Sequence, residues 1–306
     1  MIACNRAQPA FFRGARAFLL CLVLFFPCFA FAASPALTYN DTNAVLGSMK
    51  EYKTRGSESL IEIARTFGVG YKAITEANPL LDPFVPGEDV PVTIPASWIL
   101  PAVDSYDGIV INVSEMRLYY FTKQGDSRLV RIFPIGVGSE GHDTPVGQYR
   151  VIEKIVKPAW HVPESIREEK PELPRVVPPG PDNPLGSHAL RLSSDSILIH
   201  GTNRPWGVGK RVSHGCIRLY PEHISELFPL VPAGTKVTIV RQPVKAGLRN
   251  GKAFLEVHND EFDNDCDYLA LANTLLWKKG LLKYVDTEKL YRAIEQKQGT
   301  PVDISE

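Results

Sequence analysis

The side chains best suited to chemistry lie in two short segments, His200-Gly-Thr202 and Ser213-His-Gly-Cys-Ile-Arg218. A cysteine nucleophile at neutral pH needs an imidazole within hydrogen-bond reach and a third group that orients this imidazole. His200 ends an apolar run that predicts a strand, so its side chain can project into a cleft. The pattern therefore predicts Cys216 as a nucleophile and His200 as its general base.

The residues beside these two extend the interpretation. Gly215 permits a tight turn before Cys216, whose successive N–H groups would face an oxyanion. Gly201 allows another backbone to approach closely, and Arg218 supplies positive charge for a substrate carboxylate. The histidine precedes the cysteine by sixteen residues. This order counts against a papain-like peptidase, in which the cysteine comes first.

Zinc binding is the alternative use of these side chains. His188, His200, His214 and Cys216 are candidate ligands, but zinc sites prefer close pairs such as Cys-x-x-Cys or His-x-x-x-His, which are missing here. We therefore expect no metal and no cofactor. The lone histidines expected to be structural are His142, His188, His223 and His258.

The first 33 residues have the pattern of a secretion signal. Three arginines precede the apolar run from Ala17 to Phe31, and Ala30-Phe-Ala32 is a small-x-small cleavage pattern. We predict a signal peptide over residues 1–33 and an exported protein of the periplasm or cell envelope. An uncleaved N-terminal anchor is the alternative.

Export leaves two cysteines in the mature chain, Cys216 and Cys266. An oxidising compartment favours their pairing, which would block a thiol nucleophile. Carboxylates crowd Cys266, whereas histidine and arginine flank Cys216, so only Cys216 is expected to form a thiolate readily. The acidic stretch Asp260–Asp267 lacks the glycine and glutamate of an EF-hand loop, and we expect a solvated turn there.

Composition limits the class of protein. The 306 residues carry 34 basic and 34 acidic side chains, which excludes a generally basic nucleic-acid binder, and 25 prolines with 23 glycines argue against a helical bundle. This length favours about two domains. We expect no nucleic-acid partner.

Residues 48–95 are predicted to form a small α+β module of a strand, two helices and a strand. Apolar residues recur at helical spacing from Leu60 to Phe67, a second helix covers Tyr71–Ala77, and Asp89–Ile94 is typical of a strand. The stretch from Tyr52 to Ala64, followed by Asn78-Pro79, resembles a lysin motif (LysM), which implies glycan binding. A packing domain without a ligand is the alternative, and residues 95–106 are predicted to be a linker.

Residues 107–241 are predicted to form a mainly β domain, sandwich-like or barrel-like, because short β-branched runs alternate with turn residues. The segment from Pro158 to Pro184 holds eight prolines and predicts an irregular lid or a disordered insert. Residues 242–306 form an extension whose last half is predicted to be helical. The expected strands are 109–113, 117–121, 129–137, 148–156, 189–192, 196–200 and 235–240, with a helix over 221–228.

From about Asp107 to Val244 the chain resembles the L,D-transpeptidase family of bacterial cell-wall enzymes (YkuD type). The resemblance rests on the two segments above, with Thr144-Pro-Val-Gly147 and Pro158-Ala-Trp160 as further matches. It implies Cys216 as nucleophile and His200 as base. It also implies an oxyanion pocket and its support from Ser213, His214, Gly215 and Gly201, and a donor site near Arg218, Trp160 and Thr202.

The reaction implied by this resemblance is acyl transfer on peptidoglycan. Cys216 would attack the carbonyl of the third residue of a stem tetrapeptide and release D-alanine, and an amine would then resolve the thioester. The acceptor stays open between a second stem peptide, a lysine of a wall-anchored lipoprotein, and water, which would make the protein an L,D-carboxypeptidase. Two further alternatives are a cysteine amidase acting on other amides and a non-catalytic wall-binding protein.

Overall fold

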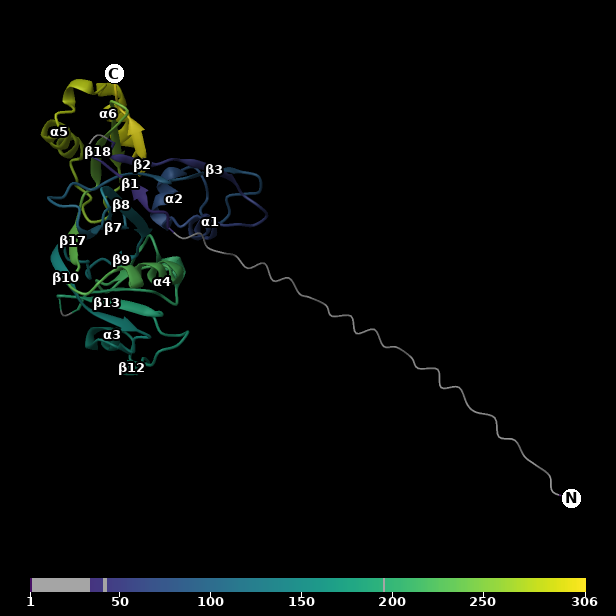
Figure 1. Cartoon of the computed structure of the whole chain (residues 1–306). Coiled ribbons are helices and arrows are strands. Elements are labelled where there is room, and N and C mark those ends of the chain that lie inside the picture. The colour runs from purple at the N-terminus through teal and green to yellow at the C-terminus, as the bar shows by residue number, and fades with distance from the viewer. Residues whose placement is uncertain (2–33, 41–42, 195) are drawn as a thin grey trace. The chain divides into compact units, whose positions relative to one another are not determined.

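The computed structural model describes Met1 and residues 34–40, 43–194 and 196–306 (Figure 1). Residues 2–33 of the predicted signal peptide lie outside this part of the chain, so the prediction stands untested. Within the described residues, no helix has the length and the apolar content needed to cross a membrane.

The centre of the described chain is a mixed sheet of nine strands, in the order β1-β8-β7-β6-β17-β10-β13-β14-β16. The fold is therefore mainly β, as the sequence predicts. The strands span β1 Leu37–Thr38, β6 Gly108–Asn112, β7 Arg117–Gln124, β8 Ser127–Pro134, β10 Gly147–Val156, β13 His188–Leu192, β14 Leu198–His200, β16 Ile217–Arg218 and β17 Lys236–Val240.

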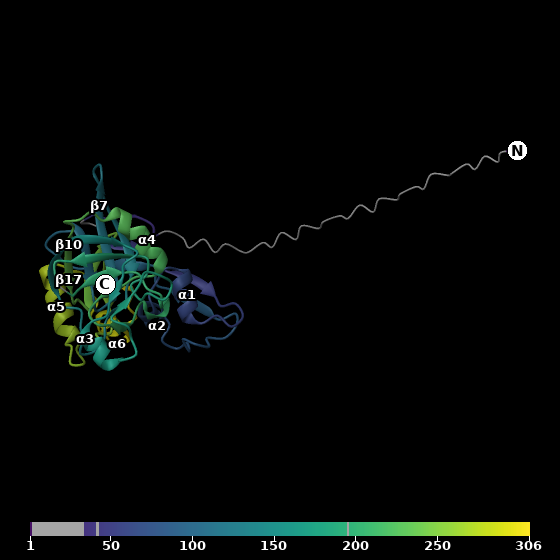
Figure 2. The ribbon, with the colours of Figure 1, turned by 90° about the horizontal axis from the view of Figure 1, so that it is seen from below.

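Strand β10 divides this sheet into two halves. Residues 147–150 pair with β17, whereas residues 151–156 pair with β13, and a register shift between Val151 and Glu153 marks a bulge at the change of partner. One apolar core joins the halves, because Ile111 of β6 and Ile199 of β14 belong to the same buried cluster. Helix α4 spans Pro221–Leu230 and is labelled in Figure 2. Its residues Ile224 and Leu227 belong to this core.

The N-terminal module has the predicted order of strand, helix, helix and strand: β3 (Lys50–Lys53), α1 (Leu60–Thr66), α2 (Tyr71–Ala77) and β4 (Pro91–Ile94). Ser59 begins α1 with a capping box, in which its hydroxyl accepts from the Glu62 N–H while the Glu62 carboxylate accepts from the Ser59 N–H. Strands β3 and β4 pair antiparallel. The element order is confirmed, and the LysM assignment stays a prediction.

The linker predicted for residues 95–106 is wrong in its first half. Strand β5 (Ser97–Ile99) pairs antiparallel with β2 (Val45–Gly47). Ile99 is fully buried, and its N–H donates to Glu256 at 2.6 Å. The apolar run Trp98-Ile-Leu100 was overlooked as a strand signal because proline and alanine precede it.

The module also makes direct contacts with helix α4 and with the loop at residues 208–209. The Arg65 guanidinium makes a two-pronged ion pair with Glu222 of α4, at 3.0 and 3.1 Å. Gly70 and Gly209 bring two backbones together, and the N–H of Tyr71 donates to the carbonyl of Val208 at 3.3 Å. A Cβ on Gly209 would lie 2.2 Å from the Tyr71 nitrogen, so this contact requires glycine.

The C-terminal extension is a small α+β unit with its own core. Its helices α5 (Tyr268–Lys278) and α6 (Thr287–Gln296) confirm the prediction, but strands β18 (Val244–Arg249), β19 (Lys252–Val257) and β20 (Pro301–Asp303) were missed. A short 3₁₀ turn, η2 (Leu282–Tyr284), lies between the helices. The hairpin between β18 and β19 turns at Asn250 and Gly251, both with positive φ, as in a type I′ turn.

The acidic stretch that begins this unit is less solvated than expected. Asp260 is 2% exposed and pairs with Arg241 at 3.2 Å, while Asp267 caps α5 by accepting from the Ala270 N–H. The solvated-turn prediction is therefore wrong at Asp260. Tertiary packing, which a local charge pattern does not reveal, buries this carboxylate.

A buried ionic network holds the extension to the rest of the chain. Glu256 of β19 contacts Arg117 at 2.7 Å, Lys245 at 3.1 Å and His258 at 2.9 Å, and His258 reaches Glu76 of α2 at 2.9 Å. Burial opposes protonation of His258, but the neighbouring carboxylates outweigh burial and raise its pKa. The network thus connects the module, the nine-stranded sheet and the extension.

The proline-rich segment is ordered, so the disordered-insert alternative is wrong. It contains the ribbon β11 (Trp160–His161) with β12 (Val176–Val177) and the helix α3 (Glu164–Glu169). The fully buried Asn183 closes the segment, since its amide donates to the carbonyls of Pro158, Val177 and Pro178. Beside the segment lie β9 (Val137–Gly138), β15 (Arg211–Ser213) and the 3₁₀ turn η1 (Pro205–Gly207).

Candidate active site

Two neighbouring strands position the side chains of the candidate site. Strands β14 and β16 are parallel, and His200 lies opposite Arg218 in their register. Cys216 immediately precedes β16, and alternate residues of a strand share a face. Cys216 and Arg218 therefore lie on the face that carries His200, while Ile199 and Ile217 turn into the core. The structure brings the two sequence segments together as predicted.

His200 is buried, with 2% of its surface exposed, and its Nδ1 lies 2.6 Å from the carbonyl oxygen of Gly201. A carbonyl oxygen only accepts hydrogen bonds, so Nδ1 carries the proton and Nε2 is left as the basic nitrogen. Burial lowers the pKa of His200 to about 3, and the charge of Arg218 adds to this shift. The imidazole is therefore neutral at pH 7, and a backbone carbonyl orients it.

Cys216 is half-buried, and its Sγ lies 3.4 Å from the carbonyl oxygen of Ser196, to which the thiol donates. Burial raises the pKa of the thiol, although the Leu198 N–H, Arg218 and Arg191 all favour the thiolate. The expectation of a readily formed thiolate is wrong, because burial outweighs the neighbouring positive charge. The resting pair is a neutral thiol and a neutral imidazole.

Cys266 is the natural comparison for Cys216. Burial also raises its pKa, and the charges of Asp260 and Asp263 add to the shift. Both cysteines are free, so the structure contains no disulfide between them. The two thiols differ in their neighbours, since strand pairing places a buried histidine beside Cys216.

The turn before Cys216 is held by hydrogen bonds from two directions. Gly215 has φ +91°, which favours glycine, and the Ser213 hydroxyl donates to the Cys216 carbonyl at 2.6 Å. The buried Thr144 donates to the Gly215 carbonyl at 3.0 Å. Because a peptide unit is planar and trans, fixing the Gly215 carbonyl also fixes the direction of the Cys216 N–H.

Thr144 is a residue whose role sequence reasoning missed. It also accepts from the Gly138 N–H at 2.9 Å, so a single hydroxyl joins β9 to the turn before Cys216. The motif Thr144-Pro-Val-Gly147 was noticed in the sequence, but nothing local in it indicates a contact with a residue 71 positions away.

Close packing explains why residue 201 is a glycine, and the neighbouring Thr202 takes part in a turn. A Cβ on Gly201 would lie 2.9 Å from the Ile224 side chain of α4, so the predicted close approach is confirmed. Thr202 is 4% exposed, and its hydroxyl accepts from the Arg204 N–H at 2.9 Å. This side chain stabilises a turn, and its expected place near the donor site stays a prediction.

Two arginines give the site its positive charge. Arg218 is half-buried, its pKa is lowered by burial, and its Nε has no hydrogen-bond partner among the described residues. Arg191 of β13 favours the Cys216 thiolate and pairs with Glu153 at 2.8 Å. Sequence reasoning missed Arg191. Trp160 lies half-buried in β11, and no contact among the described residues assigns it a role.

His214, expected to contribute its backbone N–H, has its side chain at the edge of the site. Its ring lies 4.3 Å from that of His142, between ring centres, and its Nε2 is 3.4 Å from a Glu169 carboxylate oxygen. His142 was expected to be a lone structural histidine, but it is exposed and grouped with these residues.

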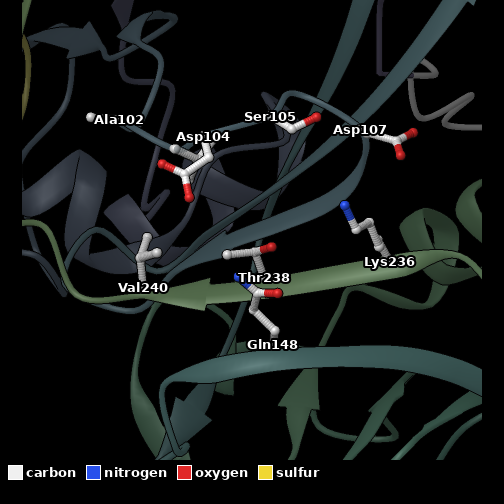
Figure 3. Close-up of a pocket in the computed structure, with 9 residues that line it drawn as sticks. Ala102, Asp104, Ser105, Asp107, Gln148, Lys236, Thr238 and Val240 are labelled. Carbon is white, nitrogen blue, oxygen red and sulfur yellow. The ribbon is translucent and has the colours of Figure 1, made fainter.

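A polar hollow of about 330 Å³ lies apart from this site, between residues 102–107 and strand β17 (Figure 3). Lys236, Thr238 and Val240 line it, whereas the intervening Val237 and Ile239 belong to the main core. The hollow therefore opens on the opposite face of β17 from that core.

A mainly β fold that pairs a cysteine with a buried, oriented histidine has the features expected of a thiol-dependent enzyme. Comparison with known proteins defines the family. Residues 106–239 match the L,D-transpeptidase catalytic domain of the YkuD family. The chain is 39% identical over 259 residues to the probable L,D-transpeptidase YcfS of Escherichia coli, covering 80% of each protein.

Two other E. coli proteins are similar over comparable lengths. The probable L,D-transpeptidase ErfK/SrfK is 39% identical, covering 81% of this chain and 83% of its own, and the probable L,D-transpeptidase YbiS is 37% identical, covering 81% and 84%. Among solved structures, the Enterococcus faecium L,D-transpeptidase catalytic domain acylated by ertapenem has 22% identity and a TM-score of 0.34, covering 44% of this chain and 95% of its own. The chain belongs to the L,D-transpeptidase family.

Proposed function

We propose that this protein is a cysteine-dependent L,D-transpeptidase of peptidoglycan stem peptides, with Cys216 as nucleophile and His200 as general base. The observation that carries the proposal is the buried, neutral imidazole, whose Nδ1 is fixed by the Gly201 carbonyl and whose Nε2 is left basic, on the strand beside Cys216. Family membership supplies the reaction class.

In the proposed reaction, Sγ of Cys216 attacks the carbonyl of the third stem residue while Nε2 of His200 takes the thiol proton. The backbone N–H groups around Gly215 and Cys216, with that of His214, stabilise the oxyanion. Collapse of the intermediate forms the thioester and expels D-alanine, whose amine receives the proton from His200. An acceptor amine then attacks the thioester, His200 removes its excess proton, and the thiol is regenerated.

The same proposal assigns the donor site. Arg218, with a free Nε, and Arg191 provide charge for a carboxylate of the donor stem. Trp160 is proposed to pack against the stem. Thr202 is proposed to contribute to the same donor site from the turn that its hydroxyl stabilises.

The two cysteines allow a test of the nucleophile. A carbapenem ring opened by a thiol leaves a thioester, so intact-protein mass spectrometry should find one adduct, mapped to Cys216 by digestion. Cys216→Ser should abolish the adduct, because a serine hydroxyl needs far more assistance from a base. Cys266→Ser is the matched control and should leave it unchanged. An adduct on Cys266, or none on the folded protein, would overturn the proposal.

Product analysis tests the acceptor. With a tetrapeptide donor and an acceptor stem, a transpeptidase gives D-alanine and a 3–3 cross-linked dimer, whereas a carboxypeptidase gives D-alanine and a tripeptide alone. We propose an amine acceptor, either a second stem or a lysine of a wall-anchored lipoprotein. Tripeptide as the sole product with both acceptors would instead identify a hydrolase.

We further propose that the N-terminal module binds wall glycan and that the protein is exported to the periplasm. The loop between α2 and β4 exposes Leu80, Phe84 and Val85 by 96%, 62% and 75%. The aromatic ring of Phe84 offers a flat apolar face on which a sugar ring can stack. Phe84→Ser should weaken sedimentation with purified sacculi. Trp277→Ser, which removes an exposed aromatic elsewhere, should not. Equal binding by both variants would remove glycan binding from the proposal.

A further inference from the structure

Three side chains from distant parts of the sequence meet beside the catalytic turn. Nε2 of His142 lies 3.9 Å from a Glu169 oxygen, and Nε2 of His214 lies 3.4 Å from the other. The two imidazole rings are 4.3 Å apart between centres. One ligand atom from each of the three residues lies within 4.8 Å of the others.

This spacing and chemistry suit a transition-metal ion. Zn²⁺ binds imidazole nitrogen and carboxylate oxygen at about 2.0–2.2 Å, so ligand atoms around a tetrahedral ion are about 3.3 Å apart. The imidazole nitrogens of His142 and His214 lie 3.9 and 3.5 Å from the same Glu169 oxygen, so these separations need to close by up to about 0.6 Å. The remaining separation, at most 4.8 Å, needs to close by up to about 1.5 Å, which rotation of these solvent-accessible side chains allows. Two imidazoles and one carboxylate leave one tetrahedral position for water or another ligand.

We propose that His142, Glu169 and His214 form a Zn²⁺ site that fastens the proline-rich segment to the catalytic turn. His142 lies in the loop after β9, Glu169 ends α3 of the proline-rich segment, and His214 stands two residues before Cys216. The site thus adds α3 of the proline-rich segment to a loop and a turn that Thr144 already connects.

Side-chain exposure supports this choice of cluster. His142, Glu169 and His214 are 40%, 47% and 29% exposed, so an ion can enter from solvent. A second group with suitable ligands, Glu115, Glu256 and His258, is fully buried, and Arg117 and Lys245 already neutralise it. A divalent cation there would face two positive charges at contact distance, so that group is an ionic network and the exposed group is the metal site.

The proposed ion would lie between α3 and the turn before Cys216. A metal bound to His214 and Glu169 holds α3 against the turn that presents Cys216. Bound Zn²⁺ would therefore limit the movement of the proline-rich segment relative to this turn. The proposed Zn²⁺ site does not depend on the proposed transpeptidase reaction, because Zn²⁺ binding can be measured in a protein that lacks the nucleophile.

Calorimetric titration with Zn²⁺ should be made in the Cys216→Ser protein, which removes the reactive thiol as a competing ligand. We expect one equivalent to bind. His142→Ala and Glu169→Gln in the same background should each weaken the affinity at least tenfold. The matched controls are His161→Ala and Glu168→Gln, exposed residues of the same types on the same segment, and they should leave the affinity unchanged.

Trypsin cleavage after Arg167 and Arg175 tests whether Zn²⁺ holds the proline-rich segment against the turn before Cys216. Zn²⁺ should slow both cuts in the Cys216→Ser protein. It should have no effect on them in the Cys216→Ser, His142→Ala protein. This second variant also shows whether Zn²⁺ acts on the protease itself. Failure to bind Zn²⁺, or affinity that survives both His142→Ala and Glu169→Gln, would overturn the proposal. Binding without protection would overturn the fastening role.

Discussion

The neutral resting pair predicts an unusual pH dependence for acylation of Cys216. If the thiol had to ionise before attack, the rate would rise about tenfold per pH unit up to its pKa, which burial raises above the usual value. If neutral His200 removes the proton during attack, the rate depends instead on how much imidazole is unprotonated.

The size of the effect follows from the pKa of about 3 that burial gives His200. At pH 5 about 99% of such an imidazole is neutral, against about 3% for an ordinary histidine of pKa about 6.5. Between pH 5 and pH 8 we therefore expect the acylation rate to change by less than about threefold. An exposed histidine in the same role would lose about thirtyfold at pH 5.

The assay is the first-order loss of carbapenem absorbance under single-turnover conditions, with circular dichroism at each pH to show that the protein stays folded. His200→Ala is the paired variant. It should react about 10²–10⁴-fold more slowly at pH 7 and should regain the tenfold rise per pH unit, because its thiol must ionise unaided. A steep rise in the unsubstituted protein, or a decline below pH 6.5, would refute the neutral-pair mechanism.

Three further outcomes are expected. Glu256→Gln leaves buried Arg117 and Lys245 short of one counter-charge and should lower the free energy of unfolding by about 3–5 kcal/mol in urea, whereas the exposed Glu288→Gln should cost under about 1 kcal/mol. Thr144→Val removes the hydrogen bond to the turn before Cys216 and should slow acylation about five- to tenfold with little change in carbapenem binding. Burial lowers the pKa of His223 to about 4, so the unfolded chain takes up its proton first as pH falls below about 6.5. His223→Gln should reduce the loss of stability between pH 6 and pH 4.5 by about 1.4 kcal/mol per pH unit, measured by urea unfolding.

Local sequence signals predicted most of the regular elements. Ser59 with Glu62 marks the start of α1, Pro221 opens α4, and the β-branched runs of the catalytic sheet stand between turn residues. Each of these signals acts within a few residues. The hairpin at Asn250-Gly251 carried an equally local signal that was overlooked, since this dipeptide favours the positive φ values observed there.

The composition of the site was predictable, but its electrostatics were not. Cys216, His200 and their glycines stand in two compact motifs, so their meeting could be expected. The raised pKa of Cys216 depends on burial, which strands and helices far along the chain create. For the same reason, no spacing in the sequence brings His142, Glu169 and His214 together, because each lies on a different segment.

The contacts that hold the N-terminal module decide how glycan binding by the module would affect this enzyme. A module on a free linker only raises the local concentration of substrate. Here the Arg65–Glu222 pair, the Gly70–Gly209 approach and the path from Glu76 to His258 hold the module in a fixed relation to the catalytic sheet. A glycan strand held by the loop at residues 80–85 would therefore present only some of its stem peptides to Cys216. Deleting the module would expose the parts of α4 and of residues 258–261 that it contacts, so its role is better examined by substitutions such as Phe84→Ser than by truncation.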